Sequence, residues 1–411
     1  MSSEPGPGAI RSPPPHLPYV YLLDASRDVS GALRAAQREA ACLRGDARFV
    51  LAIPASSKLS TREFEPFAKV LKLPIVNLRR SLGSALLYLP ALLYSGWKLA
   101  RAMRADGCQR LQVNDYYLMQ GAVARLFGYR GKIITWVRID PHQYGGPIAK
   151  LWLRVANAVS SEMVAVSRFI ASLLDADLRA ELVYDPVGDP PSPHVAPAIG
   201  VPPRFVFVAN YIPGKGQDCA IKAFGQIANA FPDARLQFHG SDLGLEKNRA
   251  YREMLGKLAS QTPGAGRIHL GGFTNDVGGV LDGALAALCL SRSESFSLTC
   301  QEASVRGLAV IATRCGGPEE IVEDGVTGYL VPLDDPVAVA DRMTRLLADP
   351  STAGTMGQRG AALVRARFGN APFRATLARL FDLPLYSADA DRPSTTEPKS
   401  ADSRGNWDES E

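Results

Sequence analysis

Two series of short apolar runs, separated by helix-length segments, constrain the fold of this chain more than any other feature. The first series comprises residues 19–23, 49–53, 111–113, 133–137 and 163–166, and the second comprises 205–209, 235–238, 268–270, 286–290 and 308–312. Short apolar runs bounded by polar segments are typical of buried strands. Their alternation with helices predicts parallel sheets. The sequence therefore predicts an α/β protein with two Rossmann-like lobes.

The stretch 185–203 lies between the two series and indicates a domain boundary. It contains seven prolines and little apolar periodicity, as interdomain linkers often do. We therefore predict a first domain over 17–189, a linker over 190–203 and a second domain over 204–366. In open parallel sheets, ligands bind beyond the carboxyl ends of the strands, so we expect a cleft between the two lobes.

The ends of the chain, its charge and its cysteines add weaker constraints. Residues 1–16 are rich in Pro and Gly and 384–411 are polar and acidic, so both are predicted to be disordered tails. A net charge of +5 over 411 residues gives no reason to expect nucleic-acid binding. Six scattered cysteines with no signal peptide before them favour reduced thiols and a cytoplasmic location.

The segment 291–307 contains the strongest candidates for ligand-binding and catalytic residues. It follows one predicted strand and precedes another, so we predict a loop and then a helix that begins near Ser297 and ends at Gly307. The free amides and the dipole of a helix start can bind phosphate oxygens without a cation. Glu302, about one turn into the helix, is placed to accept hydrogen bonds from a ribose, and Glu294 is placed to reach a sugar. The alternative is that both glutamates are ordinary solvated acids.

This segment resembles the hallmark of the retaining family 4 glycosyltransferases, also described as glycosyl transferases group 1, which are common in bacterial polysaccharide assembly. That hallmark is two glutamates with seven residues between them, followed by a small-residue helix, a glycine and a strand. Residues 315–322, with Gly316 and Gly317, resemble the family's Gly-Gly turn near the sugar, and 324–331 resemble its Gly-closed hairpin. The resemblance is dense over 204–348 and looser over the first lobe.

The resemblance implies a GT-B fold, in which two lobes face a cleft and a C-terminal helix, here 367–383, crosses back to the first lobe. It implies transfer of a sugar from a nucleotide diphosphate to an acceptor, with retention at the anomeric carbon. The diphosphate would lie against the segment formed by Ser295, Phe296, Ser297 and Leu298.

Residues 208–216 resemble the family loop that carries an arginine and a lysine toward the diphosphate. Lys215 fits, and its ammonium would stabilise charge on the leaving diphosphate, so that no metal ion or other cofactor is expected. Asn210 stands at the arginine's position and can donate a hydrogen bond but brings no charge. Arg204 and Arg292 are candidates for a compensating cation.

In the first lobe, the family places a histidine after a central strand. The residue that follows 133–137 here is Arg138, whose guanidinium could hold sugar hydroxyls or phosphate, and His142 could substitute if the loop bends. For His142 alone, a structural or solvated role is the better interpretation. Ser167 is predicted to be a helix N-cap rather than a nucleophile. The catalytic candidates are therefore Glu294, Lys215, Arg138 and His142.

The charge-free stretch 81–97 has basic residues on both sides. These are Arg79, Arg80, Lys98, Arg101, Arg104 and Arg110. A transmembrane helix is disfavoured by Pro90 and by polar positions, and a buried or cleft-facing helix is favoured. The third interpretation is a peripheral contact of residues 79–104 with an anionic membrane, which would suit a lipid-linked acceptor.

The resemblance thus implies a hexosyltransferase that uses a nucleotide-sugar donor and a glycan or lipid-linked acceptor, in polysaccharide or lipopolysaccharide biosynthesis. Two other functions stay open. GT-B lobes also serve nucleotide-sugar epimerases and hydrolases. A catalytically silent nucleotide-sugar binding module is motivated by Asn210 and Arg138, which stand where an arginine and a histidine are expected. The base, the sugar and the acceptor are not predicted by the sequence.

Overall fold

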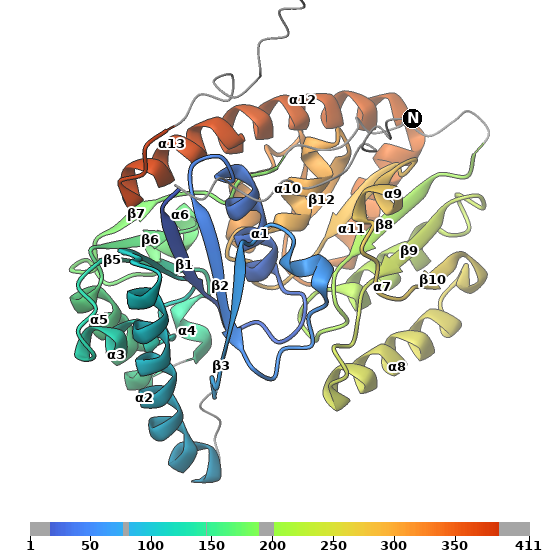
Figure 1. Cartoon of the computed structure of the whole chain (residues 1–411). Helices are drawn as coiled ribbons and strands as arrows, with labels where there is room; N and C mark the ends of the chain where they lie inside the picture. The colour runs from blue at the N-terminus through green and yellow to red at the C-terminus, as the bar shows by residue number, and fades with distance from the viewer. Residues whose placement is uncertain (1–16, 77–81, 145, 189–200, 386–411) are drawn as a thin grey trace, which may run out of the picture.

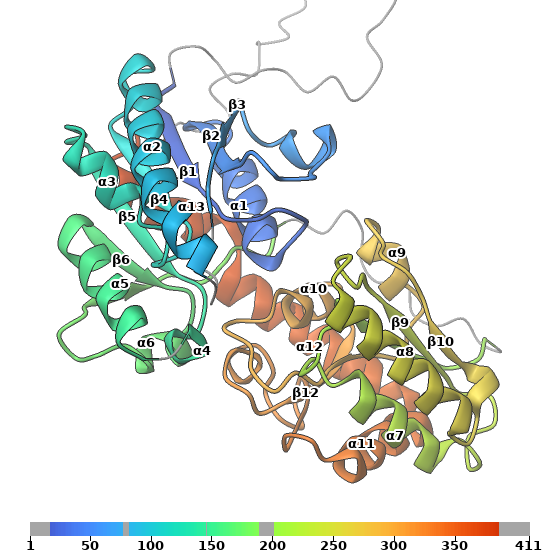
Figure 2. The same ribbon diagram turned by 90° about the horizontal axis from the view of Figure 1, so that it is seen from below.

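The computed structural model describes residues 17–76, 82–144, 146–188 and 201–385, which form two α/β lobes (Figure 1). All registered strand pairs in both sheets are parallel. The predicted tails 1–16 and 386–411, most of the predicted linker, and Arg79 and Arg80 lie outside the described residues. Figure 2 shows the two lobes from below, with α12 lying among the elements of the second lobe.

The first sheet has seven strands in the order β3-β2-β1-β4-β5-β6-β7. Its strands are β1 (Tyr19–Leu23), β2 (Arg48–Pro54), β3 (Lys69–Leu73), β4 (Arg110–Val113), β5 (Lys132–Val137), β6 (Glu162–Ala165) and β7 (Ala180–Leu182). Five of these were predicted. The edge strands β3 and β7 were missed because β3 mixes lysines with apolar residues and β7 has only three residues, all partly exposed.

The second sheet has six strands in the order β10-β9-β8-β11-β12-β13. Its strands are β8 (Arg204–Val208), β9 (Arg235–His239), β10 (Ile268–Leu270), β11 (Ala286–Cys289), β12 (Ala309–Thr313) and β13 (Gly328–Val331). The hairpin expected over 324–331 is wrong, because β13 pairs in parallel with β12. Only a local turn forms there, closed by a hydrogen bond from the amide of Gly325 to the carbonyl of Gly328.

Helices cover both faces of each sheet, because the strands carry apolar side chains on both sides. In β1, Tyr21 and Leu23 pack with one cluster, whereas Val20 and Leu22 pack with another, as the two-residue period of a strand requires. The helices are α1 (Gly31–Cys42), α2 (Leu82–Ala105), α3 (Gln120–Leu126), α4 (Pro141–Tyr144), α5 (Gly146–Val159), α6 (Arg168–Ser172), α7 (Gln217–Ile227), α8 (Glu246–Gln261), α9 (Val277–Leu281), α10 (Leu298–Val305), α11 (Pro336–Ala348), α12 (Pro350–Phe368) and α13 (Asn370–Phe381).

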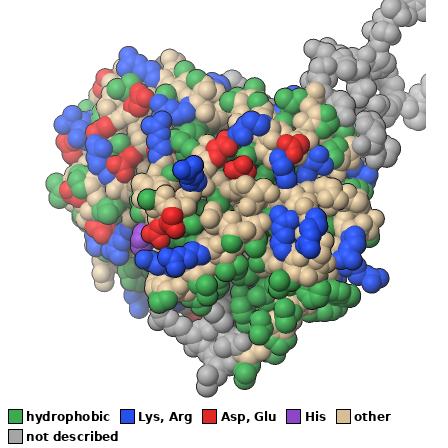
Figure 3. All heavy atoms as spheres, turned by 90° about the vertical axis from the view of Figure 1, so that its left-hand side faces the viewer, with side chains coloured by type: hydrophobic (Ala, Val, Ile, Leu, Met, Phe, Trp, Pro, Cys, Tyr) green, Lys and Arg blue, Asp and Glu red, His purple; other side chains and the backbone are tan. Residues whose placement is uncertain are grey.

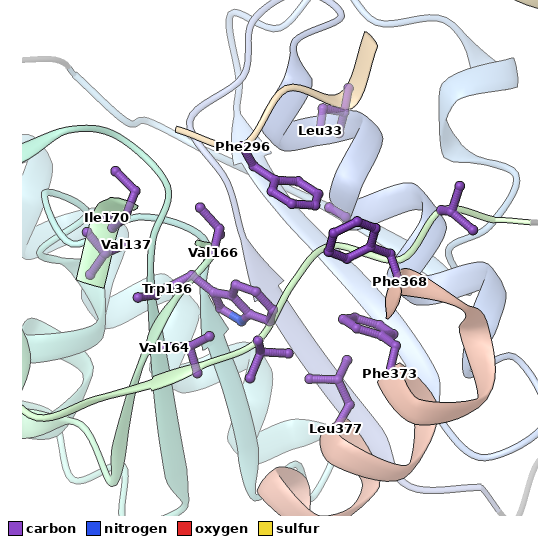
Figure 4. Packing of buried hydrophobic residues seen from close by; sticks show 14 of the residues in the cluster. Leu33, Trp136, Val137, Val164, Val166, Ile170, Phe296, Phe368, Phe373 and Leu377 are labelled. Carbon is purple, nitrogen blue, oxygen red and sulfur yellow. The ribbon is translucent and has the colours of Figure 1, made fainter. Parts of the chain in front are cut away.

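The C-terminal helix returns to the first lobe, as predicted. Helix α12 belongs to the second lobe, and α13 then packs on the first, where Arg374 forms an ion pair with the buried carboxylate of Asp46. The junction is aromatic: the ring centroid of Phe296 lies 5.2 Å from that of Phe368 and 5.5 Å from that of Tyr184. Figure 4 shows Phe296 and Phe368 beside Phe373 of α13. The two lobes therefore share a continuous apolar junction.

A second contact between the lobes is polar. Ser167 caps α6 in the first lobe, as predicted, by accepting a hydrogen bond from the amide of Ile170. Glu320 of the second lobe accepts hydrogen bonds from the amides of Arg168 and Phe169, each at 3.0 Å, at the start of the same helix. A carboxylate from one lobe therefore occupies the positive end of a helix from the other.

Helix α2 is only partly buried. Leu99, Ala100 and Met103, in its second half, are buried against the sheet. In its first half, from Leu86 onward, most large apolar side chains are exposed. The favoured expectation of a buried or cleft-facing helix is therefore wrong for that half. None of the helices within the described ranges is long and apolar enough to cross a membrane.

Candidate functional site

A cavity of about 550 Å³ lies between the lobes. Its first-lobe wall is formed by 24–26, 29–32 and Arg34 after β1, 114–115 and 117–118 after β4, 138–139 after β5, Val166 and Asp185. Its second-lobe wall is formed by 207–210, Ile212, Lys215, 239–240, 273–274, 288–289, Ser291, 294–299 and Glu302. Most of these residues follow the carboxyl ends of strands, where an open parallel sheet binds its ligands.

The start of α10 forms one wall of this cavity. The helix begins at Leu298, and the side chain of Ser297 accepts a hydrogen bond from the amide of Cys300, as expected for the predicted helix start. Ser297 has a φ of +82°, which costs a non-glycine residue about 1–3 kcal/mol and is characteristic of functional sites. Residues 295–299 line the cavity, and the ring of Phe296 is buried in the aromatic junction.

Lys215 and Glu294 meet beside this helix start. The ammonium nitrogen of Lys215 lies 2.6 Å from Oε1 of Glu294, and the hydroxyl of Ser291 donates to the same oxygen at 2.6 Å. Burial lowers the pKa of Lys215, but the carboxylate of Glu294 outweighs it and the net pKa is raised. Lys215 is therefore a fixed positive charge at neutral pH.

Two glycines allow close backbone packing of the loops that carry Lys215 and Glu294. Gly216 has a φ of +86°, and a Cβ there would lie 2.0 Å from the carbonyl oxygen of Leu290. Gly317 donates its amide to the carbonyl of Glu294 at 2.8 Å, and a Cβ on it would lie 2.3 Å from the Cα of Phe296. Gly316 and Gly317 do not line the cavity themselves but pack against the loop that does.

Glu302 lines the cavity but is paired across the cleft. Its carboxylate forms an ion pair with the guanidinium of Arg38, and Arg34 lies 3.8 Å from the same oxygen. Arg38 also donates to the side-chain oxygen of Gln301 at 2.8 Å. Sequence reasoning missed both arginines, although their spacing of four residues on α1 places them on one helix face.

Arg138 forms part of the cavity wall, but its guanidinium is bound by the first lobe. It donates to Asp185 at 2.5 Å and to Asn114 at 2.6 Å, and it forms an ion pair with Glu39. Burial raises the pKa of Glu39 to about 7, even though the guanidinium of Arg138 lowers it. In this arrangement Arg138 holds three segments of the first lobe together.

The other predicted residues are spread more widely. Asn210 lines the cavity, and its side-chain oxygen accepts a hydrogen bond from the amide of Ser241 at 3.0 Å. His142 is not brought into the site: its side chain is 72% exposed and lies 3.1 Å from Asp140, because the short α4 turns the ring to solvent. Arg204 donates to Gln237 at the far end of the strands, and Arg292 pairs with Asp334 on the surface. Neither of these arginines compensates for Asn210.

Asp115 is a further cavity residue that the sequence did not reveal. Burial raises its pKa to about 8, although hydrogen bonds from the amides of Arg138 and Tyr116 lower it. Asp24 and Asn114 lie next to it, joined by a hydrogen bond of 2.5 Å. Among the described residues, no three or more His, Cys, Asp or Glu side chains are grouped as metal ligands would be.

Two parallel α/β lobes that enclose a cleft, with a C-terminal helix crossing back, define the GT-B class of fold. Solved structures agree over most of the chain. The crystal structure of Anabaena HepE in complex with UDP and glucose has a TM-score of 0.73 at 19% identity, covering 89% of this chain and 100% of that one. The sucrose-phosphate synthase of Thermosynechococcus elongatus has a TM-score of 0.70 at 18% identity, covering 89% and 98%.

Residues 196–362 match the family model of the glycosyl transferases group 1, so the second lobe is a domain of that family. A GDP-mannose-dependent alpha-(1-6)-phosphatidylinositol monomannoside mannosyltransferase of Mycolicibacterium smegmatis is 30% identical over 174 residues, or 39% of this chain and 43% of the relative. The N-acetyl-alpha-D-glucosaminyl L-malate synthase of Bacillus anthracis is 41% identical over 81 residues, or 20% and 21%. The matches span less than half of these curated relatives.

Proposed function

We propose that this chain is a retaining, metal-independent glycosyltransferase of the family 4 type, which moves a hexose from a nucleotide diphosphate to a glycan or lipid-linked acceptor. The observation that carries the proposal is that the start of α10, Lys215, Glu294 and Glu302 line a single cavity between the two lobes. In a nucleotide sugar the diphosphate joins the sugar to the ribose, and along the chain the start of α10 likewise lies between Glu294 and Glu302.

The diphosphate is proposed to bind at the start of α10. Free amides at the helix start and the ammonium of Lys215 supply positive potential there. Glu302 accepts hydrogen bonds from the ribose hydroxyls, and Glu294 accepts them from the transferred sugar. The 2.6 Å contact between Lys215 and Glu294 keeps the two groups at the junction of sugar and phosphate.

The proposed reaction breaks the bond between the anomeric carbon and the diphosphate oxygen. The acceptor hydroxyl forms the new bond from the face that the diphosphate leaves, and the leaving phosphate oxygen takes the acceptor proton. Lys215 stabilises the charge that grows on the diphosphate, an interaction that strengthens in the transition state. Closure of the lobes would exclude water from the reacting centre.

Asn210 stands where the family has an arginine, so the proposal requires another cation to bind the diphosphate. Arg34 of α1 lines the cavity, and its side chain is 27% exposed. Its only acidic neighbour within the described residues is Glu302, at 3.8 Å. We assign Arg34 as the cation that moves to the diphosphate when the lobes close, because Arg138 is already bound by Asp185, Glu39 and Asn114.

The acceptor side lies in the first lobe, where Asp24, Asn114 and Asp115 line the cavity. The phosphatidylinositol mannoside named for the M. smegmatis relative supports a lipid-linked acceptor. We accordingly propose a role in polysaccharide or lipopolysaccharide assembly at the cytoplasmic face of a membrane.

A silent nucleotide-sugar binding module is the second candidate. It is favoured by the engagement of Arg138 with three protein side chains, which leaves the expected catalytic position occupied by a structural group. Incubation of the bound sugar nucleotide with a panel of acceptors separates the two functions. Tight binding without turnover over the whole panel would support the binding module, and rapid donor breakdown without acceptor would support an epimerase or hydrolase.

The decisive test is thermal stabilisation by a panel of nucleoside diphosphates and sugar nucleotides, with and without magnesium, because selective binding raises apparent stability. Glu302→Ala should remove most of the shift with the preferred nucleotide. Glu294→Ala should leave the shift with the nucleoside diphosphate but weaken the shift with the sugar nucleotide. The reverse order, or a shift that strictly requires magnesium, would contradict the proposal.

A further inference from the structure

The first half of α2 exposes a group of large apolar side chains. We call this group the apolar protrusion: Leu86, Leu87, Leu89, Leu93, Tyr94 and Trp97, which are 38–77% exposed. In Figure 1 the first turns of α2 extend below the rest of the first lobe. Monomeric proteins rarely expose contiguous apolar patches of this kind unless a partner covers them.

The helices around the protrusion carry basic residues and no acidic ones. Neither Asp nor Glu occurs in α2, α3 or α5, although the chain has 41 acidic residues. These helices pack side by side, α2 on α3 and α3 on α5. Their basic residues are Lys98, Arg101, Arg104, Arg125, Lys150 and Arg154. Figure 3 shows this side of the molecule, with apolar side chains gathered at the bottom and basic ones above them.

The exposed members of this basic group are available to an anionic partner, whereas the guanidinium of Arg125 donates to the carbonyls of Tyr129, Gly131 and Val159. Within the described parts of the chain, none of the six forms an ion pair with a carboxylate. Lys98 donates to the carbonyl of Lys72, and the guanidinium of Arg101 lies 5.8 Å from the ring centroid of Trp97. Arg101, Lys150 and Arg154 are exposed. The surface therefore combines uncovered apolar area with unpaired positive charge.

The position of the protrusion relates it to the cleft. Helix α2 follows β3, so its first turns lie near the carboxyl ends of the parallel strands. The first-lobe wall of the cavity is built from loops at the same ends of the strands. A surface that holds the protrusion would therefore face the side of the lobe from which an acceptor enters.

We propose that the apolar protrusion and its basic flank dock on an anionic phospholipid bilayer, with the leucines and aromatic rings in the headgroup region and the cations against lipid phosphates. Amphipathic helices bind membranes in this way when apolar burial and attraction to anionic lipid act together. The inference rests on the proposed function, since a lipid-linked acceptor would then be presented beside the cleft.

The test is co-sedimentation of the full chain with vesicles of phosphatidylcholine alone and of phosphatidylcholine mixed with phosphatidylglycerol. The wild-type protein should bind the anionic vesicles at least about tenfold more tightly, and salt should weaken the binding. The triple variant Leu86→Glu, Leu89→Glu, Leu93→Glu should lose vesicle binding, and Arg101→Glu with Lys150→Glu should weaken it about tenfold or more. The matched control is Leu333→Glu with Val337→Glu, two exposed positions on the second lobe, which should bind as the wild type does.

Nucleotide-dependent thermal stabilisation, measured on the same preparations, separates this proposal from the proposed function. Normal stabilisation with no vesicle binding, or equal binding by the triple variant, would overturn membrane docking alone. Vesicle binding that depends on the protrusion, without any nucleotide effect, would support docking and overturn the donor site. A dimer in solution that the triple variant dissolves, together with no vesicle binding, would identify the patch as a protein interface and reject the bilayer.

Discussion

The guanidinium of Arg38 in the first lobe forms an ion pair with the carboxylate of Glu302 in the second. Both side chains are 17% exposed, so the pair is largely shielded from solvent. In the proposed function Glu302 accepts hydrogen bonds from a ribose. The nucleotide must therefore displace Arg38 or share the carboxylate with it, and this contact links donor binding to the arrangement of the lobes.

Arg38→Met should destabilise the free protein by about 1–3 kcal/mol, because it leaves a partly buried carboxylate without its charged partner. Ribose hydroxyls would restore those hydrogen bonds. The preferred nucleotide should consequently stabilise the variant more than it stabilises the wild type. Thermal unfolding with and without nucleotide measures both effects. Arg44→Met, just after the end of α1, serves as the control. A smaller nucleotide effect in Arg38→Met would show that Arg38 helps to bind the nucleotide.

Lys215→Met should lower the turnover number about 100- to 1000-fold, because it removes a charge that opposes the negative charge developing on the diphosphate. KM for the sugar nucleotide should change much less. The turnover number and KM are both measured from the release of nucleoside diphosphate, with the sugar nucleotide that the thermal-stabilisation panel identifies as the donor. Lys222→Met alters a more exposed lysine on α7 and should leave the rate unchanged. An unaltered rate in Lys215→Met would remove this residue from the proposed mechanism.

Gly317→Ala should displace the loop that carries Glu294, since the added Cβ would lie 2.3 Å from the Cα of Phe296. Overpacking of this kind costs about 1–3 kcal/mol. We expect a lower melting temperature and weaker stabilisation by sugar nucleotides. Gly354→Ala, in an open position of α12, should instead raise stability by roughly 0.5–1 kcal/mol. Sugar-nucleotide binding by Gly317→Ala at wild-type strength would argue that this turn does not position the site.

Asp115 should make the stability of the protein depend on pH. Burial raises its pKa from 3.8 to about 8, so the folded state keeps a proton that the unfolded state loses. This contribution is fully present below about pH 4 and is lost as the pH rises toward 8, with a slope of about 1.4 kcal/mol per pH unit. Asp115→Asn keeps an acceptor for the amides of Tyr116 and Arg138 and should flatten the decline. The free energy of unfolding of the wild type and of Asp115→Asn, measured between about pH 4 and pH 8, checks the slope.

The exposed carboxylate of Asp177 provides the control for that experiment, because Asp177→Asn removes an acid without removing a buried group. Its stability profile should follow that of the wild type. If Asp115→Asn and the wild type lose stability in parallel as the pH rises, Asp115 is not protonated in the folded state.

The candidate site was predictable where neighbouring residues in the chain define it. The start of α10, its cap at Ser297 and the relation of Glu294 to Glu302 all follow from one segment of seventeen residues, 291–307. The partners of these groups were not predictable. Arg38 is separated from Glu302 by 264 residues and Glu39 from Arg138 by 99, and no local pattern in either segment indicates the other.

The sequence by itself determined two parallel α/β lobes and the helix start between them, because strand periodicity, glycine turns and capping residues act over a few neighbouring positions. Only the tertiary structure decided that Arg138 is held by Asp185 and Glu39, that His142 faces solvent and that the leucines of α2 are uncovered. Those outcomes depend on which distant segments pack together, since burial and ion pairing are set by the whole fold rather than by the residue type.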